Sequence, residues 1–243
     1  MKRPLLLLGL ALAPRATRAQ AVELDHVWVV VAGGAPERRA LEAAGLRVWP
    51  TVQRHEGQGT ASVMVELEGN FLELLWPDST VAVAPGREAA TARFRARQRW
   101  RSSGWSPFGI GLRTRAGAPD TLPFTTWPLR LEWMAPGEAL RMLTARADTT
   151  SPSVWVVPRS SALEDATIPA AARRHPNGAR AITALRLTMP RAAPETEAVR
   201  ALVEQHVATL ARGEAWLLEV TMDGGVRGRE RDLRPALPLV VRW

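Results

Sequence analysis

Two metal-competent side chains stand on short apolar segments in the first third of the chain. His26 lies within residues 24–31 and Glu73 within residues 70–76. Both segments are rich in β-branched or aromatic residues, which predicts strands. Burying a carboxylate in a strand is costly unless a charged or hydrogen-bonding group meets it. The pair therefore indicates either a divalent-cation site or, as the simpler alternative in an arginine-rich chain, buried ion pairs.

A second carboxylate occupies a matching position late in the chain. The segment Phe-Leu-Glu-Leu at 71–74 aligns without a gap with Leu-Leu-Glu-Val at 217–220, which pairs Glu219 with Glu73. Aligning the preceding strands places Ala184 where His26 stands, so the later segment offers an acid without a histidine. His55 lies between the first two segments, in a loop with glycines at 57 and 59. Loops carry functional residues more often than their share.

The elements around these residues form a repeated pattern. We expect a strand at 24–31, a helix from Pro36 to Gly45, and strands at 46–49, 60–67 and 70–76. Later we expect a strand at 182–189, a helix at 194–212 that buries His206, and a strand at 215–221. Such repetition implies two similar sheets packed together.

The region between the two repeats is expected to complete or extend the sheets. A basic helix is predicted at 87–103, strands at 108–114, 129–134 and 154–158, a second helix at 136–146, and a long connection at 158–177. Arginines recur at every second position from 93 to 101. On a helix this spacing spreads the charge around the axis, which predicts a solvated basic surface.

The order of elements and three motifs resemble the glyoxalase-like proteins of the vicinal oxygen chelate superfamily. The motifs are Leu-Asp-His-Val at 24–27, His-x-Gly-x-Gly-Thr at 55–60 and Phe-Leu-Glu-Leu at 71–74. The resemblance implies an α+β fold in which paired βαβββ modules form a curved mixed sheet around a pocket. Residues 22–243 would form one domain, with a first module at about 22–80, a middle segment at about 81–178 and a second module at about 179–243.

The resemblance also implies a divalent metal of unknown identity. His26, Glu73 and Glu219 would supply three ligands, with water or His55 as a fourth, and three protein ligands suffice for a catalytic metal. Glu73 or His55 would move a proton, in a lyase, isomerase or dioxygenase-like reaction on a small oxygenated molecule. The absent histidine at Ala184 leaves open an alternative, a metal-free protein that binds or sequesters a small molecule.

Tryptophan content supports this metal-free alternative. The chain has ten tryptophans, and Trp28, Trp76 and Trp216 are expected to line an apolar pocket. The expected partner is a small molecule, with a homodimer as one oligomeric alternative.

Composition bounds the other functions. The formal charge is +8, and Lys2 is the only lysine among 32 basic residues. The arginines are not gathered with aromatics into one surface, so we expect no nucleic-acid partner. Without cysteine the chain has no thiol nucleophile and no disulfide.

The first residues predict where the protein acts. Residues 1–21 resemble a secretory signal peptide, with a charged start, a short apolar run and a small-x-small cleavage site. Removing its four positive charges leaves +4. We therefore expect a periplasmic or secreted protein without a membrane anchor after cleavage; if the leader is not used, the protein is cytoplasmic.

Overall fold

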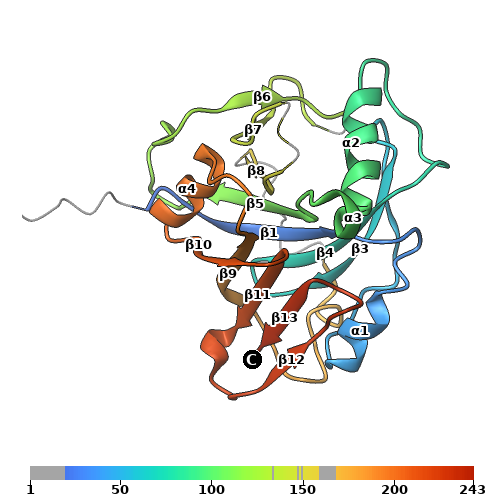
Figure 1. Cartoon of the computed structure of the whole chain (residues 1–243), viewed down its shortest axis with the longest axis vertical. Coiled ribbons are helices and arrows are strands. Elements are labelled where there is room, and N and C mark those ends of the chain that lie inside the picture. The colour runs from blue at the N-terminus through green and yellow to red at the C-terminus, as the bar shows by residue number, and fades with distance from the viewer. Residues whose placement is uncertain (1–19, 133, 147, 149, 159–167) are drawn as a thin grey trace, which may run out of the picture.

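The strands of the chain form an eight-stranded and a five-stranded sheet (Figure 1). The computed structural model describes residues 20–132, 134–146, 148, 150–158 and 168–243. Residues 1–19, which hold nearly all of the predicted signal peptide, lie outside this part. Within it, no helix is long and apolar enough to cross a membrane.

The first half of the large sheet is a βαβββ module, as predicted. It consists of β1 (Val22–Val30), α1 (Arg38–Ala43), β2 (Gln53–His55), β3 (Thr60–Glu66) and β4 (Phe71–Pro77). β1 runs parallel to β4, while β4–β3 and β3–β2 are antiparallel. The strand predicted at 46–49 is wrong, because Leu46 and Val48 are buried in the core while that segment forms no ladder. The second strand begins at Gln53 instead.

The second half of the large sheet comes from the middle of the chain and repeats the strand arrangement of the first half. It consists of β5 (Phe108–Thr114), β6 (Trp127–Leu129), β7 (Leu140–Met142) and β8 (Ser153–Val156). β5 runs parallel to β8, and β8–β7 and β7–β6 are antiparallel, so the strand order mirrors that of the first half. The halves join through the antiparallel pair β1–β5. The partner module is therefore residues 108–156, and the helix predicted at 136–146 is wrong because β7 occupies its centre.

The last part of the chain forms the five-stranded sheet instead of pairing with the first module. It contains β9 (Ile182–Pro190), α4 (Glu197–Glu204), β10 (Ala208–Gly213), β11 (Leu217–Met222), η3 (Asp223–Gly225), β12 (Glu230–Asp232) and β13 (Leu239–Arg242). The strand order is β10-β9-β11-β13-β12. Residues 179–243 thus do not complete the curved sheet around the pocket, contrary to the expected module boundaries.

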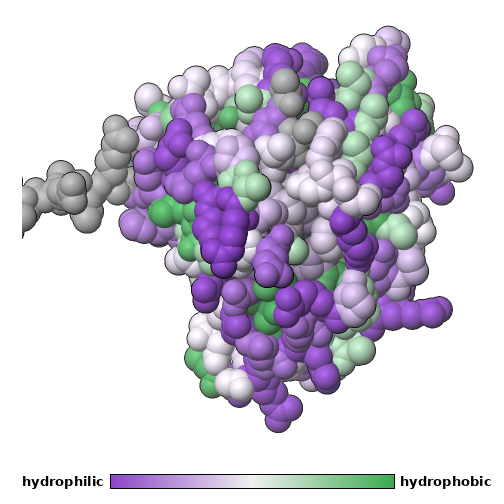
Figure 2. Space-filling model, in the orientation of Figure 1, coloured by the Kyte–Doolittle hydropathy of each residue, from purple (hydrophilic) through white to green (hydrophobic). Residues whose placement is uncertain are grey.

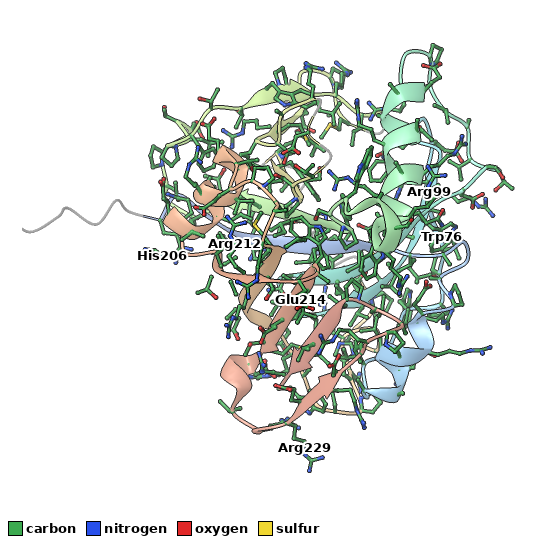
Figure 3. The ribbon with its side chains drawn as sticks, in the orientation of Figure 1. Trp76, Arg99, His206, Arg212, Glu214 and Arg229 are labelled. Carbon is green, nitrogen blue, oxygen red and sulfur yellow. The ribbon has the colours of Figure 1, made fainter. Side chains whose placement is uncertain are left out.

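The helix predicted at 194–212 stops at Glu204, and the rest of that segment is a strand. β10 pairs in parallel with β9 from Ala208 to Gly213, so a long-range ladder overrides the helical spacing. His206 has a φ of 54° between the two elements. It lies exposed at the end of α4 (Figure 3), so the prediction that it is a core residue is wrong.

The two faces of the large sheet have different neighbours. One face packs against the small sheet, with alternate residues such as Val27, Val29, Leu72 and Leu74 in a shared core. The other face carries the residues in between, and α2 (Glu88–Gln98) lies over it, followed by α3 (Trp100–Ser103). The outer surface seen in Figure 2 is largely hydrophilic.

The helices and the two mixed sheets together make the predicted α+β fold with a curved mixed sheet.

Candidate functional site

A pocket of about 830 Å³ opens on the face of the large sheet that α2 covers. Pockets that bind small molecules span roughly 300–1,000 Å³, so this one is large enough for such a ligand. Both halves of the sheet and α2 contribute to its wall. Its apolar members include Trp28, Phe71, Leu75, Phe94, Trp127, Leu131, Leu140, Met142 and Trp155. It is the expected place for the site residues of β1 and β4.

His26 faces this pocket in a fixed orientation. The register between β1 and β5 shifts between Leu24 and His26, and the buried Asp25 lies in this irregularity. Asp25 Oδ1 lies 2.5 Å from His26 Nδ1. The imidazole stacks on Phe71, with ring centroids 4.3 Å apart and planes at 8°. Asp25 and the Phe71 ring together fix the imidazole with Nδ1 at the Asp25 carboxylate, so Nε2 is the nitrogen left for other partners.

Glu73 and His55 form a second acid–histidine pair in the same pocket. The Glu73 side chain is only 7% exposed, and its Oε1 lies 3.6 Å from His55 Nε2. His55 Nδ1 lies 3.0 Å from Thr60 Oγ1, and Ser62 Oγ lies 3.4 Å from Nε2. The tight turn after β2 places His55 here, and Gly57 in that turn has a φ of 80°. The two residues expected to move a proton, Glu73 and His55, are thus in contact with each other inside the pocket.

Glu219 lies elsewhere. On β11 of the small sheet it pairs in register with Arg186 of β9, and its carboxylate forms ion pairs with Arg186 at 3.5 Å and with Arg242. Its neighbours Leu218 and Val220 point into the core between the sheets, so Glu219 faces outward. The structure therefore does not bring Glu219 together with His26 and Glu73, and the ion-pair alternative describes it.

The aromatic wall differs from the expected set of tryptophans. Trp28 lies in the pocket, with its ring centroid 6.1 Å from that of Trp155 and 5.6 Å from that of Phe94. Trp76 belongs to the core on the opposite face of the sheet. Trp216 lies in that core as well and donates from Nε1 to the Gly104 carbonyl. Trp155 and Trp127 of the second half take their places.

Two glycines on β5 carry the signal that could have located this wall. A Cβ at Gly109 would lie 2.0 Å from Trp28, and a Cβ at Gly111 would lie 2.7 Å from His26 and 3.0 Å from Trp155. Alternate glycines in an otherwise apolar strand mark a close approach of other groups. Phe-Gly-Ile-Gly-Leu at 108–112 is such a pattern.

Arg97 fixes α2 over the pocket. Its side chain is buried, and Nη1 donates to the carbonyls of Ser106 at 2.5 Å and Ser151 at 3.0 Å. Burial lowers the pKa of Arg97 to about 10, although the nearby Asp148 carboxylate acts in the opposite direction. The guanidinium stays charged at neutral pH. Sequence reasoning missed this residue because an arginine in a basic run predicts exposure.

Comparison of the sequence with family models gives a match. The model of the glyoxalase-like domain family matches residues 24–203. The chain belongs to the glyoxalase-like domain family. Among solved structures, a hypothetical protein from Staphylococcus aureus has a TM-score of 0.53 at 8% identity, covering 91% of this chain and 98% of that chain, which shows a shared fold. No curated protein matches the chain.

The donor set of this glyoxalase-like domain does not fit the expected metal centre. Of the three predicted ligands only His26 and Glu73 line the pocket. In the described residues there is no group of three or more His, Cys, Asp or Glu side chains that could hold an ion. β5 and β8, which correspond to β1 and β4 in the second half, contain no His, Asp or Glu. A catalytic metal normally has three protein ligands.

Proposed function

We propose that this glyoxalase-like domain binds a small, flat, oxygenated molecule through its aromatic pocket, without a metal ion. The observation that carries the proposal is the concentration of Trp28, Phe94 and Trp155 around a cavity with two acid–histidine pairs on one wall. Flat rings bind planar apolar groups by stacking. The polar groups of the pairs are few and fixed, as in sites that orient a ligand.

The histidines give the ligand its polar contacts. In the tautomer in which His26 Nδ1–H donates a hydrogen bond to Asp25 Oδ1, Nε2 is a hydrogen-bond acceptor. A hydroxyl group on the ligand would donate to this nitrogen. The Phe71 stack keeps the ring in place, so this contact costs little conformational entropy on binding.

Titration of tryptophan fluorescence with a library of planar aromatic and oxygenated compounds tests this function. Ligands should quench the emission of the purified protein with a saturable curve that is unchanged by EDTA. Trp155→Ala should weaken binding at least tenfold, because it removes one face of the wall. Trp105→Phe is the matched control, since Trp105 does not line the pocket. Absence of any saturable ligand, or binding that EDTA abolishes, would refute the proposal.

A second candidate function, proton transfer on the bound molecule, is favoured by the pair of Glu73 and His55. A carboxylate 3.6 Å from an imidazole nitrogen can take a proton from a ligand and pass it on. This is acid–base chemistry of the lyase and isomerase kind. For each ligand found by fluorescence, NMR in D₂O would show exchange of an acidic C–H. Glu73→Gln should abolish the exchange while binding persists; exchange at the wild-type rate would exclude Glu73 as the base.

Measuring the metal content of the purified protein and of His26→Ala tests the metal alternative directly. Metal-free binding predicts no stoichiometric divalent ion in either protein after exposure to a metal mixture and desalting. A stoichiometric ion that is lost in His26→Ala would instead support the metal-dependent enzyme.

A further inference from the structure

One stripe of α2 lines the pocket and carries cationic side chains. Ala90, Arg93, Phe94 and Arg97 recur at spacings of three and four residues, which places them on one helical face. Phe94 of this stripe contacts Trp28 across the cavity. Arg95 and Arg99 lie outside the stripe and are exposed. The arginines at 93, 95, 97 and 99 thus divide into a pocket-facing pair and a solvent-facing pair.

The pocket-facing pair is not electrically balanced. Among the described residues, the carboxylate that acts on Arg97 is that of Asp148, which is itself held by the backbone and hydroxyl groups of Thr150 and by the backbone of Ser151. Arg93 lies close enough to Arg97 for its charge to lower the pKa of Arg97. In this part of the pocket wall two guanidinium groups therefore lie near one carboxylate.

Arg93 is the member of this group that lacks a partner. Across residues 20–132 and the other described segments, no hydrogen bond or ion pair includes its guanidinium group, although the side chain is partly buried and lines the pocket. The other pocket arginines are engaged. Arg54 bonds Thr80, Arg87 bonds the Arg130 carbonyl, and Arg146 stacks on Trp127 at 3.8 Å.

We infer that the ligand of this pocket is a planar carboxylate whose anionic group binds the guanidinium of Arg93 while its ring lies among Trp28, Phe94 and Trp155. This inference rests on the proposed binding function and narrows its ligand class. A guanidinium group presents a planar fork of donors that matches a carboxylate. An anion here also offsets the repulsion between Arg93 and Arg97. The acid–histidine pairs line the opposite part of the wall, on β1, β2 and β4, where they meet the other end of the ligand.

The test compares two probes that differ mainly in charge, 2-naphthoate and 2-naphthylmethanol, by isothermal titration calorimetry. The wild-type protein should bind 2-naphthoate at least about tenfold more tightly, the difference expected for a charge-assisted hydrogen bond. Arg93→Gln should bring the two affinities to within about threefold of each other. Arg95→Gln is the matched control on the exposed side of α2 and should keep the wild-type preference.

The outcomes separate this inference from the proposed function. Equal affinity of the wild-type protein for both probes would refute the carboxylate inference and leave the binding function intact. If Arg93→Gln and Arg95→Gln lose the preference for 2-naphthoate equally, the inference is refuted as well, because the preference would then come from general surface charge. If neither probe binds at millimolar concentration, the carboxylate inference is refuted, and the fluorescence titration with the whole library decides the binding function separately.

Discussion

His55 and Glu73 illustrate how a single contact makes a buried charge tolerable. Glu73 lies in an apolar strand with 7% of its side chain exposed, and His55 Nε2 lies 3.6 Å away. A buried carboxylate without a partner costs more than the pair gains by forming. The contact therefore stabilises the pocket wall, and in the proposed function it is also the acid–base pair.

A double-mutant cycle on this pair should give a measurable coupling energy. His55→Ala alone should lower the free energy of unfolding by about 1–3 kcal/mol, because it leaves the Glu73 carboxylate buried without the imidazole. Glu73→Gln removes the charge. In that background, the decrease in the free energy of unfolding caused by His55→Ala should be smaller by about 0.5–3 kcal/mol. Urea unfolding of the three variants and the wild type measures this coupling. Additive effects would mean that the two side chains do not interact in solution.

His175 is a histidine with a structural role that depends on its being neutral. Its Nδ1 accepts from the Arg47 amide at 2.9 Å, so Nε2 carries the proton and donates to the Glu66 carbonyl at 2.8 Å. Burial is the largest effect and lowers the pKa of His175 below its ordinary value, and the Arg47 charge adds to this. A second proton on the ring would break the bond to the Arg47 amide.

Stability should therefore fall in mild acid. His175 takes up a proton near pH 6.5 in the unfolded chain, whereas in the folded protein it is protonated only at a lower pH. The free energy of unfolding then decreases as the pH falls below about 6.5, until the folded-state pKa is passed. Urea unfolding at pH 7.5 and 5 should show this loss in the wild type and a smaller one in His175→Gln. His206→Asn, at the exposed turn, should lose as much stability between pH 7.5 and 5 as the wild type. If His175→Gln also loses as much as the wild type, the neutral structural role of His175 is contradicted.

At the scale of elements, β5 decides the shape of the pocket wall. Its glycines at 109 and 111 leave space into which Trp28 and His26 extend from the neighbouring strand. In most strands a glycine weakens packing. Here the absent side chains leave room for the rings of Trp28 and His26 from β1.

Substituting these glycines should disturb binding more than folding. Gly111→Ala would place a Cβ 2.7 Å from the His26 ring, and overpacking of this kind costs about 1–3 kcal/mol. We expect this loss in urea unfolding, together with weaker ligand binding, because His26 must move from Phe71. Gly33→Ala is the control, since nothing lies within 4 Å of a Cβ there. Unchanged binding by Gly111→Ala would show that the position of His26 is unimportant.

The first module could be predicted from the sequence because its signals are local. Apolar alternation, Pro36 and Gly45 mark its strands and helix, and His26 and Glu73 fall in the pocket as expected. Which later segment pairs with it depends on long-range ladders that no local pattern records. The Phe71–Leu74 and Leu217–Val220 segments look alike, yet β4 runs parallel to β1 and β11 antiparallel to β9. In addition, β11 belongs to the small sheet, and Glu219 points to the outer face of that sheet, where it meets Arg186 and Arg242 and not the pocket.

At the scale of the whole molecule, the small sheet closes the core that the large sheet cannot close alone. Leu218 and Val220 of β11 and Leu239 and Val241 of β13 are fully buried in the core shared by the two sheets. Burial of such side chains stabilises by about 1.5–3 kcal/mol each. Net stability is a small difference between such burial and the conformational entropy of the chain, so loss of these four contacts would remove a large part of what holds the domain folded. The pocket lies on the far face, so the small sheet supports it without contributing to its wall.

A chain that ends at residue 203 should therefore fail to fold, although it retains every residue matched by the family model. It lacks β10 to β13, so β9 loses both of its neighbours and the apolar face of the large sheet meets water. We expect aggregation or the absence of a cooperative melt in circular dichroism and size-exclusion chromatography. Arg186→Ala, which changes only the outer face of the small sheet, should melt cooperatively like the full chain. A monomeric truncated chain with a cooperative melt would show that the eight-stranded sheet and α2 fold by themselves, and that the small sheet is an addition to an independent binding domain.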